Sequence, residues 1–136
     1  MIVDTSALVA VLVHEPGHEA LLAALLAEPA VLPAPARLEF LTVARGNRVG
    51  LGAQAEALLD RLTAIGLETL DWSAEHAAIA GDAQIAYGKG NGRGGTLNLL
   101  DLMVYAVAIA RSEPLLFTGQ DFIETDVTVH PASQTA

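Results

Sequence analysis

Four acidic residues stand in mostly apolar stretches far apart in the sequence, and together they could bind a divalent cation. They are Asp4, Glu39, Asp101 and Asp121. Two carboxylates about 5 Å apart repel by roughly 3 kcal/mol at an effective dielectric near 20, so four in one cleft need a cation between them. Ligation by oxygen alone is typical of the hard cations Mg²⁺ and Mn²⁺.

Asp101 gives the strongest argument of the four. It lies in the stretch 97–110, which is apolar on nearly every face and therefore predicts a buried helix. A lone buried carboxylate costs on the order of several kcal/mol unless it is paired, neutralised or bound to a metal. Asn98 and Tyr105 share its helix face. The alternative is a buried Asp101 that is hydrogen-bonded by Asn98 and a backbone amide, with no metal.

For the other three acids, the evidence for a shared site is their position relative to the predicted strands and helices. Asp4 and Asp121 each lie just past the C-terminal end of a predicted strand, where open α/β sheets place their chemistry. Glu39 and Asp101 lie near the N-terminal portions of predicted helices. Each also has an ordinary explanation, because Asp4 could cap a helix, Glu39 could complement a helix dipole and Asp121 could belong to a turn.

The elements that must position these acids are predicted strands and helices that alternate along the chain. Alternation of this kind predicts an α/β fold with a mostly parallel sheet of about five strands flanked by helices, in a single domain over 1–136. Thr5 or Ser6 is expected to cap the first helix, and Pro33-Ala34-Pro35 to form a turn. The tail 131–136 is expected to be frayed. The predicted strands are 1–4, 30–32, 67–70, 115–117 and 127–130, and the predicted helices are 5–13, 18–28, 36–48, 53–65, 73–87 and 97–111.

Composition bounds the class of protein. The chain has 136 residues, of which 52% are hydrophobic and 17% charged, so it has enough apolar surface for a compact core. With no cysteine, disulfides and thiolate metal sites are excluded. There is no membrane-length apolar run and no signal sequence, so we expect a cytoplasmic protein with no membrane partner. The net charge of −9 argues against nucleic-acid binding, but carboxylates loaded with cations can present positive potential to a phosphate.

Several motifs, in order along the chain, resemble those of PIN-domain ribonucleases of the VapC toxin type. The resemblance implies a PIN-like fold, a quartet of Asp4, Glu39, Asp101 and Asp121 binding Mg²⁺ or Mn²⁺, and endonucleolytic cleavage of RNA. It also implies a cognate VapB-type antitoxin and a homodimer. The chain departs from the family pattern at Gln120, where an acid or Asn is common, and at Pro35-Ala36, where the helix often opens with Ser or Thr. The matching motifs are Ile2-Val3-Asp4-Thr5-Ser6-Ala7, the isolated Glu39, Tyr87-Gly88-Lys89-Gly90 with the stretch 97–108, and Leu115-Leu116-Phe117-Thr118-Gly119-Gln120-Asp121-Phe122.

The mechanism expected of such a site is metal-assisted phosphodiester hydrolysis. One ion held chiefly by Asp4, Asp101 and Asp121 would lower the pKa of a bound water, and a second near Glu39 would stabilise the leaving oxygen. Four nearby polar residues, Thr5, Ser6, Asn98 and Thr118, are expected to orient ligands or waters. The cations expected to contact the RNA backbone are Arg37, Lys89 and Arg93, the last two on the glycine-rich loop 88–96, which could gate the substrate or simply carry solvated charges.

Two other functions remain open from the residues alone. A Mg²⁺-dependent phosphoaspartyl or receiver protein is also small, acidic and α/β, and Asp71 follows a predicted strand. However, the late strand carries no Lys, and Ser6 stands where a phosphatase would have a second Asp. A non-catalytic RNA- or protein-binding module on the same fold is the second alternative. Trp72 is expected in the core or an interface, and the four histidines show no metal-ligand spacing, so they are given no catalytic role.

Overall fold

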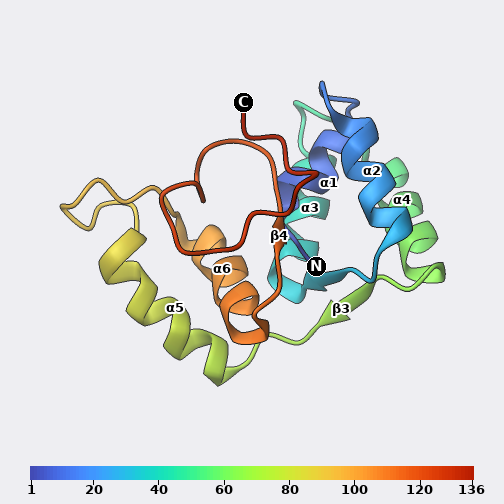
Figure 1. Ribbon diagram of the computed structural model, residues 1–136. Coiled ribbons are helices and arrows are strands. Elements are labelled where there is room, and N and C mark those ends of the chain that lie inside the picture. The colour runs from blue at the N-terminus through green and yellow to red at the C-terminus, as the bar shows by residue number, and fades with distance from the viewer.

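Four short parallel strands form the centre of the computed structural model, which describes all residues from 1 to 136 (Figure 1). Their order across the sheet is β3-β2-β1-β4, so the first strand lies in the interior between the second and the last. The register pairs Ile2 with Val31 on one side and with Leu115 on the other. The strands are β1 (Ile2–Val3), β2 (Val31–Pro33), β3 (Glu68–Leu70) and β4 (Leu115–Leu116).

Six helices flank the sheet, as the alternating pattern predicted. In Figure 1, α5 and α6 lie together at one end of the molecule, and α2 and α4 lie at the other. One apolar core joins the layers and contains the fully buried side chains of Phe40, Leu59 and Phe117. The helices are α1 (Thr5–Leu12), α2 (His18–Ala27), α3 (Ala34–Arg45), α4 (Gly52–Ala64), α5 (Ala74–Tyr87) and α6 (Leu99–Arg111).

The helix starts differ from three of the sequence predictions. The N-cap of α1 is Asp4 itself, not Thr5 or Ser6, because the Asp4 carboxylate accepts the Ser6 backbone N–H. No turn forms at 33–35, since Pro33 ends β2 in an extended conformation and α3 begins at once, with Pro35 tolerated in its first turn. The last long helix begins at Leu99, because Asn98 caps it.

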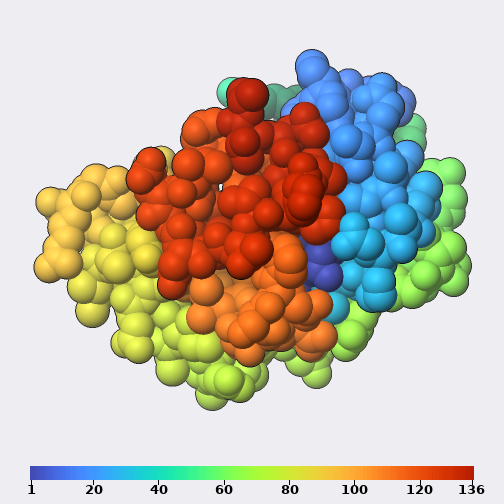
Figure 2. All heavy atoms as spheres, viewed as in Figure 1, coloured from blue at the N-terminus to red at the C-terminus, as the bar shows by residue number.

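The C-terminal part of the chain also differs from prediction. Residues 127–130 do not form a fifth strand, because β4 has only two residues and offers Val129 a single parallel bridge, at Leu115. The segment after Pro131 is not frayed up to Gln134, whose backbone is hydrogen-bonded to Phe117 and Gly119. Figure 2 shows this end of the chain, in red, covering the middle of one face. No helix is long and apolar enough to cross a membrane.

Candidate metal-dependent nuclease site

All four predicted acids line one hollow of about 240 Å³. The hollow lies where β1 and β4 end, beside the N-termini of α1 and α6 and the middle of α3. The sheet topology explains why two of these acids are close together. Because β1 and β4 are adjacent and parallel, Asp4 and the turn that carries Asp121 lie at the same edge of the sheet. The lining residues are Asp4, Thr5, Ser6, Val9, Glu15, Glu39, Val43, Asp101, Thr118, Asp121 and Phe122.

Asp4 is the most deeply buried of the four, with 5% of its surface exposed. Its Oδ2 accepts the Ser6 N–H at 3.0 Å and the Ser6 hydroxyl at 2.5 Å, and its Oδ1 makes no hydrogen bond within the protein. Burial raises the pKa of Asp4 to about 6, and repulsion from Glu39 and Asp121 adds to the rise against the opposing Ser6 hydrogen bonds. The carboxylate is thus fixed by one oxygen and has the other free for a ligand.

Asp101 forms a reciprocal capping box with Asn98 at the start of α6. The Asn98 N–H donates to Asp101 Oδ2 at 3.0 Å, and the Asp101 N–H donates to Asn98 Oδ1 at 2.8 Å. Burial raises the pKa of Asp101 to about 7, opposed by the Asn98 N–H and assisted by repulsion from the other three acids. Hydrogen bonding by Asn98 was the alternative to a metal role, and it accounts for only one of the two carboxylate oxygens.

Glu39 and Asp121 complete the hollow from α3 and from the turn after β4. Glu39 is half-buried and Asp121 is exposed, and neither carboxylate accepts a hydrogen bond from the protein. The Asp121 backbone is held, because the Thr96 hydroxyl donates to its carbonyl oxygen at 2.5 Å. These two side chains are therefore the ones free to rotate toward a common ion.

The chemistry of this donor set fits a hard divalent cation. No lysine, arginine or histidine forms an ion pair with any of the four carboxylates, so nothing in the protein neutralises them. As the side chains lie, no three acids or histidines in the chain are arranged to hold one ion. Chelation therefore requires rotation at the hollow, which the unbonded side chains of Glu39 and Asp121 allow.

The polar residues expected to orient ligands occupy different positions around these acids. The Ser6 hydroxyl joins Asp4 to the backbone N–H of Thr118, which donates to Ser6 Oγ at 3.0 Å. The Asn98 side chain is committed to the capping box. The Thr5 hydroxyl donates instead to the carbonyl of Ala36 on α3, at 3.2 Å, and so ties two helices together.

The three expected RNA-contacting cations do not line the hollow. Arg37 lies on α3 and donates to the Thr69 hydroxyl at 3.3 Å. Lys89 and Arg93 are exposed on the loop 88–96, and this loop is internally bonded, since Asn91 Oδ1 accepts the Arg93 N–H at 2.8 Å. The end of the same loop reaches the site through Thr96.

Two features near the site could not be predicted from the sequence, namely a fifth acid in the hollow and a second, apolar hollow beside it. Glu15, in the turn between α1 and α2, adds a fifth acid to the hollow, although nothing in its local sequence marks it. A larger apolar hollow of about 1020 Å³ adjoins the site and shares Glu39 with it. Trp72 lines this second hollow and donates from Nε1 to the Met103 carbonyl, consistent with the predicted place in the core or an interface.

Tyr105 and Asp71 do not join the acid hollow. The Tyr105 hydroxyl donates to Asp126 at 2.5 Å instead of approaching Asp101. Asp71, the residue on which a receiver function would depend, borders the apolar hollow beside Trp72. The arrangement therefore favours the four-acid site over a phosphoaspartate site.

The sequence pattern of the PIN domain family matches residues 1–127. Together with the parallel sheet, this match defines the chain as a PIN domain protein. Ribonuclease VapC36 of Mycobacterium tuberculosis is 42% identical over 130 residues, which cover 93% of this chain and 91% of that protein. Ribonuclease VapC42 of the same species is 40% identical over 129 residues, covering 93% and 96%. Within the PIN domain family, the chain belongs to the VapC ribonucleases.

Solved structures share the fold at low sequence identity. VapC20 of M. tuberculosis, a sarcin-ricin loop cleaving toxin, has a TM-score of 0.70 at 17% identity over 93% of this chain and 95% of that one. VapBC2 from Rickettsia felis, bound to a DNA fragment from its promoter, has a TM-score of 0.67 at 17% identity, covering 99% and 96%. These likenesses concern the α/β architecture.

Proposed function

We propose that this chain is the toxin of a VapBC pair and hydrolyses RNA phosphodiester bonds at a site built from Asp4, Glu39, Asp101 and Asp121, with Mg²⁺ or Mn²⁺. The observation that supports the proposal most is the meeting of four carboxylates, from four distant stretches, with no cationic partner in the protein. The mutual repulsion of such a cluster opposes folding unless a cation neutralises it. Its presence in the chain therefore indicates a functional role. The PIN family is typically metal-dependent, which agrees with this donor set.

In this proposal the protein supplies positioning and charge. When bound, the metal supplies a water of lowered pKa and an electrophilic contact for the phosphate. Ser6 keeps Asp4 Oδ2 in place and leaves Oδ1 for ligation, and Asn98 does the same for Asp101. The pKa of Asp101, about 7, means that this carboxyl must give up a proton before it can ligate at neutral pH. Because this pKa belongs to the metal-free chain, metal affinity, and with it cleavage at sub-saturating metal, is expected to increase with pH up to about 7.

The cognate partner is proposed to be a VapB-type antitoxin. The structural neighbours include toxin–antitoxin complexes, from Klebsiella pneumoniae and from Salmonella typhimurium among others. An acidic chain of net charge −9 with an acid-lined hollow complements a basic partner segment. The proposed place of action is the cytoplasm, where both RNA and an antitoxin from the same operon would meet the chain.

A homodimer is also proposed, with the apolar hollow beside the site as its contact. Leu38 on α3 is 66% exposed, and Leu100, Met103 and Trp72 continue the same apolar lining. Apolar side chains gathered around one open hollow offer a candidate contact surface for a second copy of the chain. A dimer formed there would place two acid sites next to each other across the contact, because Glu39 lines both hollows.

The test is RNA cleavage with mapping of the new ends. Purified native chain is incubated with total RNA in Mn²⁺, in Mg²⁺ and in EDTA, beside Asp101→Asn, which keeps an acceptor for the Asn98 N–H. The proposal expects defined new ends with metal, none in EDTA and none from the variant. RNA binding without cleavage under all metal conditions would instead establish a non-catalytic binding module.

A further inference from the structure

The turn that carries Asp121 is hydrogen-bonded to the C-terminal tail, in addition to its contacts with Ser6 and Thr96. β4 ends at Leu116, so the sheet does not hold the residues that follow. Ser133 Oγ accepts the N–H of Phe117 at 3.1 Å, and the Phe117 carbonyl accepts the N–H of Gln134 at 3.1 Å. Further along, the Gly119 N–H donates to the Gln134 carbonyl at 2.9 Å, and the Gln120 side-chain amide donates to the Thr135 carbonyl. Residues 133–135 thus run parallel to 117–120.

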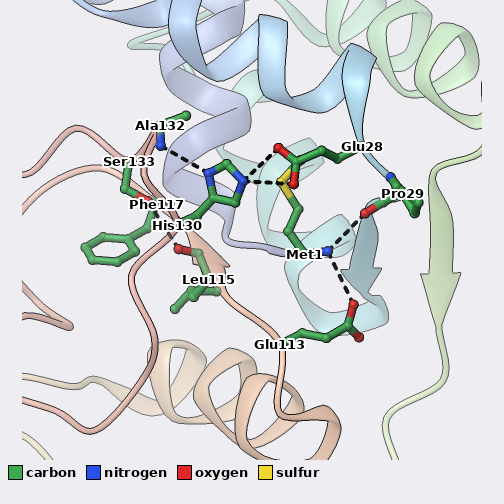
Figure 3. A network of polar contacts seen from close by, with 9 residues as sticks. All are labelled: Met1, Glu28, Pro29, Glu113, Leu115, Phe117, His130, Ala132 and Ser133. Atoms are coloured by element: carbon green, nitrogen blue, oxygen red, sulfur yellow. Dashed lines mark hydrogen bonds and ion pairs between the residues drawn. The ribbon is translucent and has the colours of Figure 1, made fainter.

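The tail is itself anchored to distant parts of the fold (Figure 3). His130 is buried, with its Nε2 at 2.9 Å from Glu28 Oε2 near the end of α2 and its Nδ1 accepting the Ala132 N–H at 3.1 Å. Since Nδ1 is an acceptor, Nε2 carries the proton that faces Glu28. The Ser133 hydroxyl donates to the carbonyl of Leu115 at 3.2 Å. The start of the tail is therefore fixed to the rest of the fold, so the tail restrains the Asp121 turn and does not move with it.

A second contact anchors the end of the tail. The side chain of Gln134 packs on Gly17, where an added Cβ would stand 2.2 Å from Gln134 Oε1. Gly17 has φ of +86°, so this position favours glycine for two reasons. Two separated points, at the end and at the start of α2, thus hold the segment that borders the Asp121 turn.

We propose that residues 130–135 form a positioning segment for Asp121, with Ser133 as its central positioning residue. The inference depends on the proposed function, because it gives Asp121 a metal-binding role. It goes beyond the family pattern, which matches residues 1–127 and so does not include this segment. Partners that hydrogen-bond a metal ligand typically change metal affinity or activity by about 10- to 100-fold when removed. This segment acts one step further out, because it bonds residues 117–120 and not the Asp121 carboxylate, so the lower end of that range is expected.

Ser133→Ala tests the proposal, because it removes the acceptor of the buried Phe117 N–H. Ser133→Thr keeps the hydroxyl and should rescue. Thr135→Ala is the matched control, since the Thr135 side chain makes no hydrogen bond and only its carbonyl contacts the turn. Mn²⁺ binding is measured by electron paramagnetic resonance in the absence of RNA, and kcat and KM are measured for a fixed RNA substrate.

The expected result is an Mn²⁺ dissociation constant raised about 10-fold in Ser133→Ala, a lowered kcat at fixed Mn²⁺ and an unchanged KM for RNA. Ser133→Thr and Thr135→Ala should match the native chain. Should Ser133→Ala fail to fold, Gln120→Ala decides, because Gln120 is exposed and its loss removes the contact with Thr135; a weaker Mn²⁺ affinity is again expected. If the folded variant binds Mn²⁺ and turns over RNA as well as the unsubstituted chain does, the positioning role is refuted but the proposed function stands. If the unsubstituted chain itself neither binds Mn²⁺ nor cleaves RNA, both the positioning role and the proposed function are refuted.

Discussion

Replacing Asp4 with Asn should make the metal-free protein more stable while abolishing RNA cleavage. Asn has nearly the same shape, is an equally good helix N-cap and keeps an oxygen for the two Ser6 hydrogen bonds. What the substitution removes is a charge in a site where only 5% of the residue is exposed. The stabilising effect of Asn therefore measures the cost of holding that charge in the folded chain.

The size of this cost follows from the raised pKa. Burial takes the pKa of the Asp4 carboxyl from 3.8 to about 6 in the folded chain. This difference corresponds to about 3 kcal/mol of folding free energy once the carboxyl is ionised in both states. For a chain of this length, such a gain raises Tm by roughly 10 °C. Asp4→Asn should show this gain at pH 8 in EDTA.

The sign of the pH dependence is fixed by the direction of the pKa shift. The folded chain holds the Asp4 proton more firmly than the unfolded chain does. The contribution of Asp4 to stability is therefore complete below about pH 4 and is lost as the pH rises through about 6. The advantage of Asp4→Asn over the native chain should accordingly be near zero at about pH 4 and reach its full value above about pH 7.

Urea denaturation followed by circular dichroism measures both proteins in EDTA across this pH range, and again with saturating Mn²⁺. With Mn²⁺ the order should reverse, because the ion stabilises only the chain that binds it. A variant less stable than the native chain at pH 8 in EDTA would refute the reasoning. So would a gain in stability that does not change with pH.

Three further predictions concern the RNA contact, the interface and the core. The double change Lys89→Ala and Arg93→Ala should raise KM for RNA, reduce its salt dependence and leave kcat unchanged; an unaltered KM would exclude the loop from binding. Leu38→Glu should convert a dimer to a monomer in sedimentation velocity, and an unchanged mass would place the dimer contact elsewhere. Phe40→Ala should lower the free energy of unfolding by about 3–5 kcal/mol in urea titrations, because Phe40 is fully buried; a loss under about 1 kcal/mol would contradict its place in the core.

The parts of the site that depend on local sequence could be predicted. Asp4 follows directly on the apolar residues of β1, and a parallel sheet brings strand ends to one edge. The spacing of Asn98 and Asp101 places them on one helix face, and the structure joins them in a capping box. The convergence of all four acids was a hypothesis from these placements, and they do line one hollow.

The parts that depend on long-range contacts could not be predicted. The tail 131–136 is short, begins with proline and has small and polar residues, which is typical of a frayed end. Long-range contacts order it, through pairing with residues 117–120 and through contacts with Glu28 and Gly17. The expected strand at 127–130 fails for a related reason, because its partner β4 is two residues long. Glu15 reaches the acid hollow only through the path of the chain between α1 and α2.

The most direct test of the account is a crystal structure of the chain with Mn²⁺, located by its anomalous scattering. We predict an ion in the acid hollow, coordinated directly by carboxylate oxygens of Asp4, Asp101 and Asp121, with the Asp121 side chain rotated inward. Mn²⁺ bound elsewhere, or a hollow whose carboxylates stay apart at saturating Mn²⁺, would contradict it.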